Sequence, residues 1–170
     1  MVGASYPAGI TFRPGLRGNR INLLRVQVQV AVSGKKEKFE VKNALTARKV
    51  QRVIDGYGVE FVEALRLGPG HYSYSAQVTR QAHSAAEFNA YRQAIGRLMP
   101  KLLDAEGRML QPSGGATRSD MNTYGFTFEA RTNAAAGQKV GEPTTFSWEI
   151  PSELKTIPLT VEFKDLSLPQ

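Results

Sequence analysis

The chain has 170 residues, of which 41% are hydrophobic and 22% are charged, and it contains no cysteine. This length and composition are typical of one globular domain. The lack of cysteine excludes disulfides, Cys-based zinc sites, iron–sulfur clusters and thiol nucleophiles. We expect a soluble chain without a membrane span or signal peptide, because no apolar run approaches about 18 residues and residues 1–20 lack a basic-then-apolar order. The compartment stays open between the cytoplasm and a processed exported form.

The positive charge is concentrated near the N-terminus. The formal net charge is +7, yet residues 1–52 hold eleven Lys and Arg residues against two acidic ones, while the remaining 118 residues hold eleven basic and thirteen acidic residues. Such asymmetry points to a polyanionic partner or to an acidic protein surface, and it carries no information about the fold.

Residues 1–20 are predicted to form an extended basic arm. Gly and Pro recur at short intervals there, and neither helical nor strand periodicity is present. The apolar residues that would anchor this arm on a partner are Tyr6, Ile10, Phe12 and Leu16. An arm of this kind lies along a neighbouring subunit and adds backbone hydrogen bonds at a sheet edge. The alternative is a linker remnant without a function.

The next part of the chain is predicted to form strands. Residues 21–32 alternate apolar and polar side chains, which is the period of a half-buried strand. The dipeptide Ser33-Gly34 then predicts a turn, and Phe39 and Val41 indicate a short second strand with a basic rim.

Two later segments, residues 53–61 and 102–110, share one pattern: two aliphatic residues, then Asp-x-x-Gly, then two residues and an apolar one. Asp favours the start of a turn and Gly favours a left-handed backbone position, so both segments are interpreted as strand, turn, strand. On this interpretation Glu60 and Glu63 lie on a strand and face opposite sides, which argues against a paired acid and base.

One helix is predicted, from about residue 85 to residue 99. Ser84 and Glu87 have the spacing of a capping box, apolar residues recur every three or four positions, and Pro100 stops the pattern. A strand is predicted before it at residues 71–80, and a polar Gly-rich loop after it at residues 111–121.

Three more strands are predicted near the C-terminus. Their apolar alternation covers residues 124–130, 146–150 and 157–163, and Pro158 places the last strand at a sheet edge or starts it there. Many short strands with one helix favour a mainly β fold. We therefore expect one antiparallel β-sandwich of immunoglobulin-like or jelly-roll-like type over residues 21–170, with one amphipathic helix and the arm of residues 1–20.

The C-terminal half carries a resemblance. Residues 146–169, from Phe146-Ser-Trp148 to the final Leu168-Pro169, resemble the closing strands of β-sandwich modules found in uncharacterised bacterial proteins, many of them exported. The Asp-x-x-Gly-Arg-x-Leu turn at residues 104–110 is similar to a turn of the same modules. The resemblance covers less than a quarter of the chain and implies a fold, not an activity.

No catalytic set, metal site or cofactor motif is apparent. His71 and His83 lie in separate predicted elements without carboxylates at metal-ligand spacing, and no loop has the ligand density of a calcium site. The serines lie outside any G-x-S-x-G elbow, and the Ser113-Gly114-Gly115 stretch lacks the lysine of a phosphate-binding loop. We expect a protein that is not an enzyme and needs no cofactor.

Three interpretations of the function remain. The first is a structural or protein-interaction subunit that assembles with itself or with a protein partner through the arm and the sheet edges. The alternative is a module that binds nucleic acid or another polyanion through basic residues of the N-terminal third. The residues of this alternative are Arg13, Arg17, Arg20, Lys35, Lys36, Lys38 and Lys42. An unrecognised enzyme is a third reading.

Overall fold

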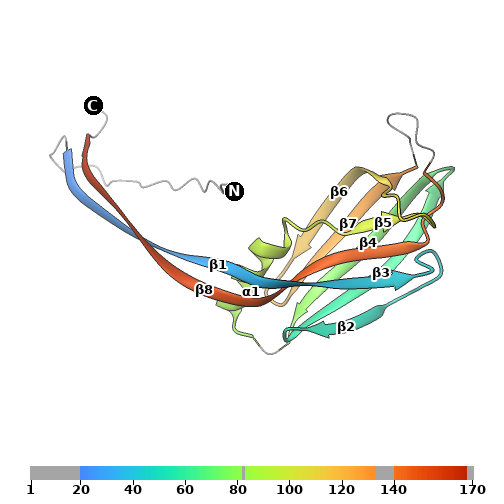
Figure 1. Ribbon diagram of the computed structural model, residues 1–170, viewed down its shortest axis with the longest axis horizontal. Helices are drawn as coiled ribbons and strands as arrows, with labels where there is room; N and C mark the ends of the chain where they lie inside the picture. Colours follow the sequence, from blue (N-terminus) through green and yellow to red (C-terminus); the bar gives the residue numbers. More distant parts are fainter. Residues whose placement is uncertain (1–19, 82, 133–139, 168–170) are drawn as a thin grey trace. The chain divides into compact units, whose positions relative to one another are not determined.

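The computed structural model describes residues 20–81, 83–132 and 140–167 (Figure 1). The proposed anchors Tyr6, Ile10, Phe12 and Leu16, and the cations Arg13 and Arg17, lie outside the described residues. The boundary between the arm and the sandwich therefore stays a prediction.

The described chain is mainly β, with antiparallel strand pairing and one helix, which confirms the predicted fold class. Its elements are β1 (Arg20–Lys42), β2 (Val50–Ile54), β3 (Tyr57–Gly68), β4 (His71–Arg80), α1 (Ala85–Ile95), β5 (Lys101–Leu103), β6 (Gln111–Ser119), β7 (Thr123–Arg131) and β8 (Thr145–Ser167).

These elements belong to two compact units. One unit, which we call the body, comprises Val30–Ile157. The described part of the other unit, which we call the ribbon, comprises residues 20–29 of β1 and residues 158–167 of β8. Both long strands contribute to both units, and each unit is described separately below.

The strands form two sheets (Figure 1). The larger sheet has the order β2-β3-β4-β7-β6, and the smaller sheet has the order β1-β8-β5. Inward-facing side chains of both sheets form one core in the body, as expected of a sandwich. Phe146 of β8 lies at its centre, with its ring 4.7 Å from that of Phe61 on β3 and 6.0 Å from that of Phe39 on β1.

Helix α1 begins where the sequence predicted. The Ser84 side chain accepts a hydrogen bond from the Glu87 N–H, and the Glu87 side chain accepts one from the Ser84 N–H, so the capping box is complete. The helix buries Phe88, Tyr91 and Ile95 against the core. It ends at Ile95, four residues before the predicted end, because Gly96 caps it and the chain then turns toward β5.

The predicted hairpin at residues 53–61 is confirmed, with a tighter turn than expected. Ile54 pairs with Tyr57, so Asp55 and Gly56 alone form the turn, with φ of 50° and 76°. Two left-handed residues are the signature of a type I′ turn. The second glycine of the pattern, Gly58, is a strand residue of β3.

The segment at residues 102–110 also turns back, with a wider turn. Leu103 bridges to Met109, and Gly107 has a φ of 77° between them. The two segments that look alike in sequence therefore share the reversal and differ in turn length.

The predicted turn at Ser33-Gly34 is wrong, because β1 continues through it. The Ser33 hydroxyl donates to the Ser152 carbonyl of β8, and Gly34 lies against Glu153. Glu153 has a φ of 53°, the left-handed conformation found in β-bulges. The apolar positions of β1 change from even to odd numbers across this point, although the strand is continuous.

Two further predictions fail for related reasons. Residues 146–150 and 157–163 belong to one strand, β8, which runs through Pro151 and Pro158. Strand β5 pairs with β8 only at residues 145–147, so Pro158 lies where β8 has a free edge and needs no donor, as predicted for an edge position.

The predicted loop at residues 111–121 is mostly the edge strand β6.

Strand β3 contains a bulge that changes which residues share a face. The register shifts between Phe61 and Glu63, so that Glu60 pairs with Gln77 and Glu63 pairs with Ser75. Gln77 and Ser75 lie on the same outer face of β4, and the expectation that Glu60 and Glu63 face opposite sides is wrong.

Two phenylalanines on the same strand test the difference between body and ribbon. We expect Phe146→Ala to lower the free energy of unfolding by about 3–5 kcal/mol, because the side chain is fully buried. We expect Phe163→Ala, in the ribbon, to lower it by less than about 1 kcal/mol. Urea denaturation followed by the fluorescence of the single tryptophan, Trp148, measures both at a protein concentration too low for association to contribute. Equal losses would contradict this assignment.

Candidate functional site

The ribbon has two chemically different faces. Arg25 on β1 forms an ion pair with Glu162 on β8, with 2.6 Å between Nη2 and Oε1, so these two side chains share one face. Successive side chains of a strand point to opposite faces. Leu24 and Val26 on β1, and Val161 on β8, therefore lie on the other face.

The apolar face of the ribbon is open among the described residues. Leu159, Val161 and Phe163 are 47%, 41% and 44% exposed. Figure 1 shows β1 and β8 side by side here without a third strand, in agreement with the sheet order. Among the residues that the structure describes, no second layer covers this row of side chains.

The charged residues of the ribbon are largely paired with one another. Arg20 Nη2 lies 3.1 Å from Asp165 Oδ1, in addition to the pair between Arg25 and Glu162. Exposed pairs of this kind contribute little to stability. They neutralise most of the ribbon's charge, and the role of Arg20 in binding a polyanion stays a prediction.

The lysines predicted to bind a polyanion lie on β1 within the body. Phe39 and Val41 face the core, so Lys36, Lys38 and Lys42 lie on the outer face of the smaller sheet, and Lys35 has the opposite parity. All four side chains are exposed.

Carboxylates lie among these lysines. Lys36 Nζ is 3.1 Å from Glu149 Oε2, and Lys38 Nζ is 2.7 Å from Glu40 Oε1. The neighbouring Lys38 ammonium lowers the pKa of Glu40, through its hydrogen bond first and then its charge. Two of the four lysines therefore already have carboxylate partners, and the binding of a polyanion by these lysines stays a prediction.

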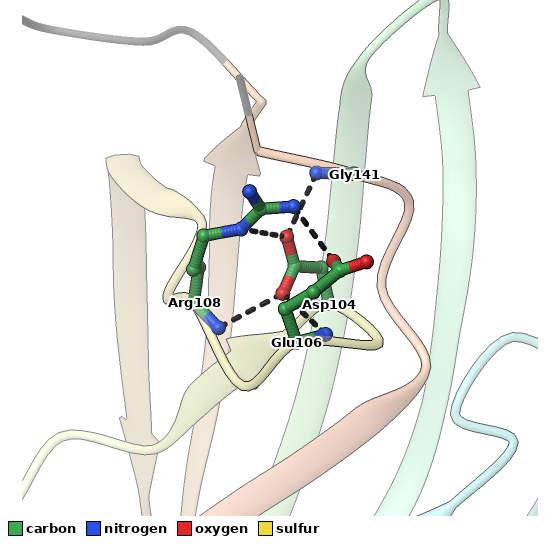
Figure 2. A network of polar contacts seen from close by, with 4 residues as sticks. All are labelled: Asp104, Glu106, Arg108 and Gly141. Atoms are coloured by element: carbon green, nitrogen blue, oxygen red, sulfur yellow. Dashed lines mark hydrogen bonds and ion pairs between the residues drawn. The ribbon is translucent and has the colours of Figure 1, made fainter. Parts of the chain in front are cut away.

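The most highly connected polar cluster surrounds Asp104, at the start of the turn after β5 (Figure 2). Its buried carboxylate accepts hydrogen bonds from the N–H groups of Glu106, Arg108 and Gly141. Arg108 Nε also donates to Oδ2 over 2.7 Å, and the Arg108 guanidinium contacts Glu106 as well.

All the contacts of the Asp104 carboxylate described above are made with other parts of the chain, and they stabilise the fold. Burial by itself would raise the pKa of Asp104, but the Gly141 and Arg108 hydrogen bonds and the Arg108 charge outweigh it and lower the pKa to about 2. The carboxylate closes the turn of residues 104–108 and ties it to the segment that leads into β8. Since all its lone pairs are engaged, we assign Asp104 a structural role.

The two histidines also have protein partners. His71 Nε2 lies 2.9 Å from Glu129 Oε2, on neighbouring strands of the larger sheet. His83 stacks on Tyr57 with 4.2 Å between ring centroids and contacts the Asp55 carbonyl through Nε2. Within the described ranges, no group of three or more His, Asp or Glu side chains is placed to hold a metal ion.

Sequence reasoning missed two features of these surfaces. It recognised the alternation of residues 157–163 as a strand but not their open apolar face, because alternation alone does not tell whether a second layer covers a face. It also missed Lys101 and Ser147, which lie opposite each other on β5 and β8. No local motif connects residues that far apart in sequence.

Comparison with protein-family models, with curated proteins and with solved structures found no match to this chain. The resemblance to bacterial β-sandwich modules stays a prediction. In the part of the chain that the structure describes, no helix has the length and apolar character to cross a membrane.

The lowered pKa of Asp104 leads to a testable prediction about how the stability of the fold depends on pH. A carboxyl group whose pKa is lowered on folding stabilises the folded state above its unfolded pKa, near 4, and loses that contribution as pH falls toward about 2. We expect Asp104→Asn to be less stable than the wild type at neutral pH, and we expect the difference to shrink between about pH 5 and about pH 2.

Chemical denaturation at several pH values measures this difference. The matched control is Glu106→Gln, which changes an exposed carboxylate of the same turn and should alter stability little. A difference for Asp104→Asn that stays constant across this pH range would contradict the assignment of the carboxylate charge to stability.

Proposed function

We propose that this protein is a non-catalytic assembly subunit that associates with further copies of itself through the apolar face of its ribbon. The observation that carries the proposal is the row of half-exposed Leu159, Val161 and Phe163 on a two-stranded element. An isolated two-stranded hairpin is marginally stable in water, and it gains stability when a hydrophobic face is covered.

A second copy is the occupant that this face fits. An apolar row on one ribbon is complementary to the same row on another, and two such ribbons packed face to face make four strands with a dry interior. The charged groups do not oppose this arrangement, because Arg20 and Arg25 already have carboxylate partners within the same ribbon. A partner therefore need not bring compensating charge.

The free edge of β1 supplies a second contact. Among the described strands of the smaller sheet, β1 has β8 on one side and no strand on the other, so its outer N–H and C=O groups are candidates for pairing with another chain. A stable interface buries roughly 800 Å² on each partner, more than one row of side chains offers. The predicted anchors Tyr6, Ile10, Phe12 and Leu16 are the chain's own candidates for the remainder of that contact.

Two lysine substitutions on adjacent residues test the proposal. Val161→Lys places a charge on the apolar face, whereas Thr160→Lys places the same charge on the polar face of the same strand. We expect the wild type and Thr160→Lys to form a defined oligomer, and we expect Val161→Lys to shift the equilibrium strongly toward the monomer. Light scattering on a sizing column, at low and high salt, measures the mass.

The oligomer should persist at high salt, because apolar burial is not screened. Circular dichroism checks that both variants keep the fold. A monomeric wild type, or an equal effect of the two substitutions, would overturn the proposal.

A further inference from the structure

A second surface, in the body, has the character of a ligand site. On the outer face of the smaller sheet lies a pocket with a volume of about 460 Å³. This volume lies within the range of small-molecule sites, which is roughly 300–1,000 Å³. The pocket is independent of the ribbon and of the function proposed above.

The floor of the pocket is a row across three strands. Phe146 and Trp148 face the core, so Ser147 between them faces outward. Lys101 on β5 is the register partner of Ser147, and Lys38 on β1 lines the same pocket. Ser147 is only 7% exposed, so its hydroxyl lies at the bottom of the hollow with a lysine on each side.

The charge of the pocket is positive. Lys38, Arg97 and Lys101 line it together with one carboxylate, Glu149, and Lys38 is paired with Glu40, 2.7 Å away. Glu149 is itself paired with Lys36, 3.1 Å away. Among the described residues Lys101 has no ion-pair partner, and the Ser147 hydroxyl makes no hydrogen bond. The pocket therefore has one ammonium and one hydroxyl with unused donor capacity at its floor.

One wall of the pocket is apolar. Leu98 and Met99, from the segment between α1 and β5, and Leu103 at the end of β5 line it. The position of this wall is fixed from below, because the Trp148 Nε1 donates to the Leu98 carbonyl over 2.5 Å. A ligand would thus meet cationic and hydroxyl donors at one end and aliphatic side chains at the other.

We propose that this pocket binds a small organic oxyanion of the phosphate or sulfate monoester class. Its oxygens accept hydrogen bonds from Lys101 Nζ, Lys38 Nζ and Ser147 Oγ, and its apolar part lies on Leu98 and Met99. Charge-assisted hydrogen bonds of this kind are about twice as strong as neutral ones, and apolar contact adds to them. Phosphate and sulfate share the recognised chemistry, and parallel titrations distinguish them.

The experiment titrates the full chain with phenyl phosphate, phenyl sulfate and inorganic phosphate. Isothermal titration calorimetry measures affinity, and the fluorescence of Trp148 reports on the Leu98 wall. We expect saturable binding with one site per chain, and we expect phenyl phosphate to bind roughly tenfold more tightly than inorganic phosphate because of the apolar wall. Equal affinities for phenyl phosphate and inorganic phosphate would contradict the proposed contact between the ligand and the apolar wall.

Substitutions inside and outside the pocket test whether the ligand binds there. Lys101→Gln should weaken binding about tenfold, the loss of one charge-assisted hydrogen bond, and Ser147→Ala should weaken it less. The matched control is Lys155→Gln, which removes an exposed lysine of β8 outside this pocket and should leave the affinity unchanged. No saturable binding, or equal losses for Lys101→Gln and Lys155→Gln, would overturn the proposal.

A single-stranded oligonucleotide provides the contrasting case. If it binds with an affinity that falls steeply with salt and responds equally to Lys101→Gln and Lys155→Gln, the basic surface recognises polyanions in general and the proposal of a small-molecule pocket fails. Because none of these variants touches the ribbon, the outcome is separate from that of the assembly test.

Discussion

The structure depends on β8, a 23-residue strand whose two parts meet different constraints. In the body, Phe146, Trp148 and Ile150 are buried between two sheets, and the aromatic contacts of Phe146 reach β1 and β3. In the ribbon, apolar residues still occupy alternate positions, now odd-numbered, at Val161 and Phe163, but only one neighbouring strand is present among the described residues. The number of layers around the strand, rather than its own sequence, decides whether an apolar residue stabilises the fold or remains available.

The sequence predicts much of this fold because period-two alternation is a local property. The strands at residues 71–80 and 124–130, the capping box at Ser84 and the reversal at Asp55 each follow from residues close together in the chain. The failures have a different origin. Ser33-Gly34 continues as strand, with Ser33 donating to the Ser152 carbonyl of β8 and Gly34 lying against Glu153.

The same argument explains β6 and the prolines. Gly115 looks like a loop residue, yet a side chain there would collide with the ring of Phe128 on β7, so the small residue is what permits close pairing. Pro158 is tolerated in a strand because β5 ends its pairing at Ser147 and leaves that edge free. In each case the deciding contact comes from a residue distant in sequence, which local patterns do not reveal.

The two proposed surfaces differ because β8 has different neighbouring strands in its two parts. Where β5 and β1 flank it, the outward Ser147 lies between lysines, and the three-strand row brings together cations that the sequence separates by more than 60 residues. Where only β1 flanks it, charged side chains pair across the ribbon on one face and leave the other face apolar. Salt weakens binding in a cationic pocket but does not screen apolar burial, so only the pocket is expected to lose affinity as ionic strength rises. Assembly through the ribbon and binding in the pocket are therefore compatible functions of one chain, since neither surface uses a residue of the other.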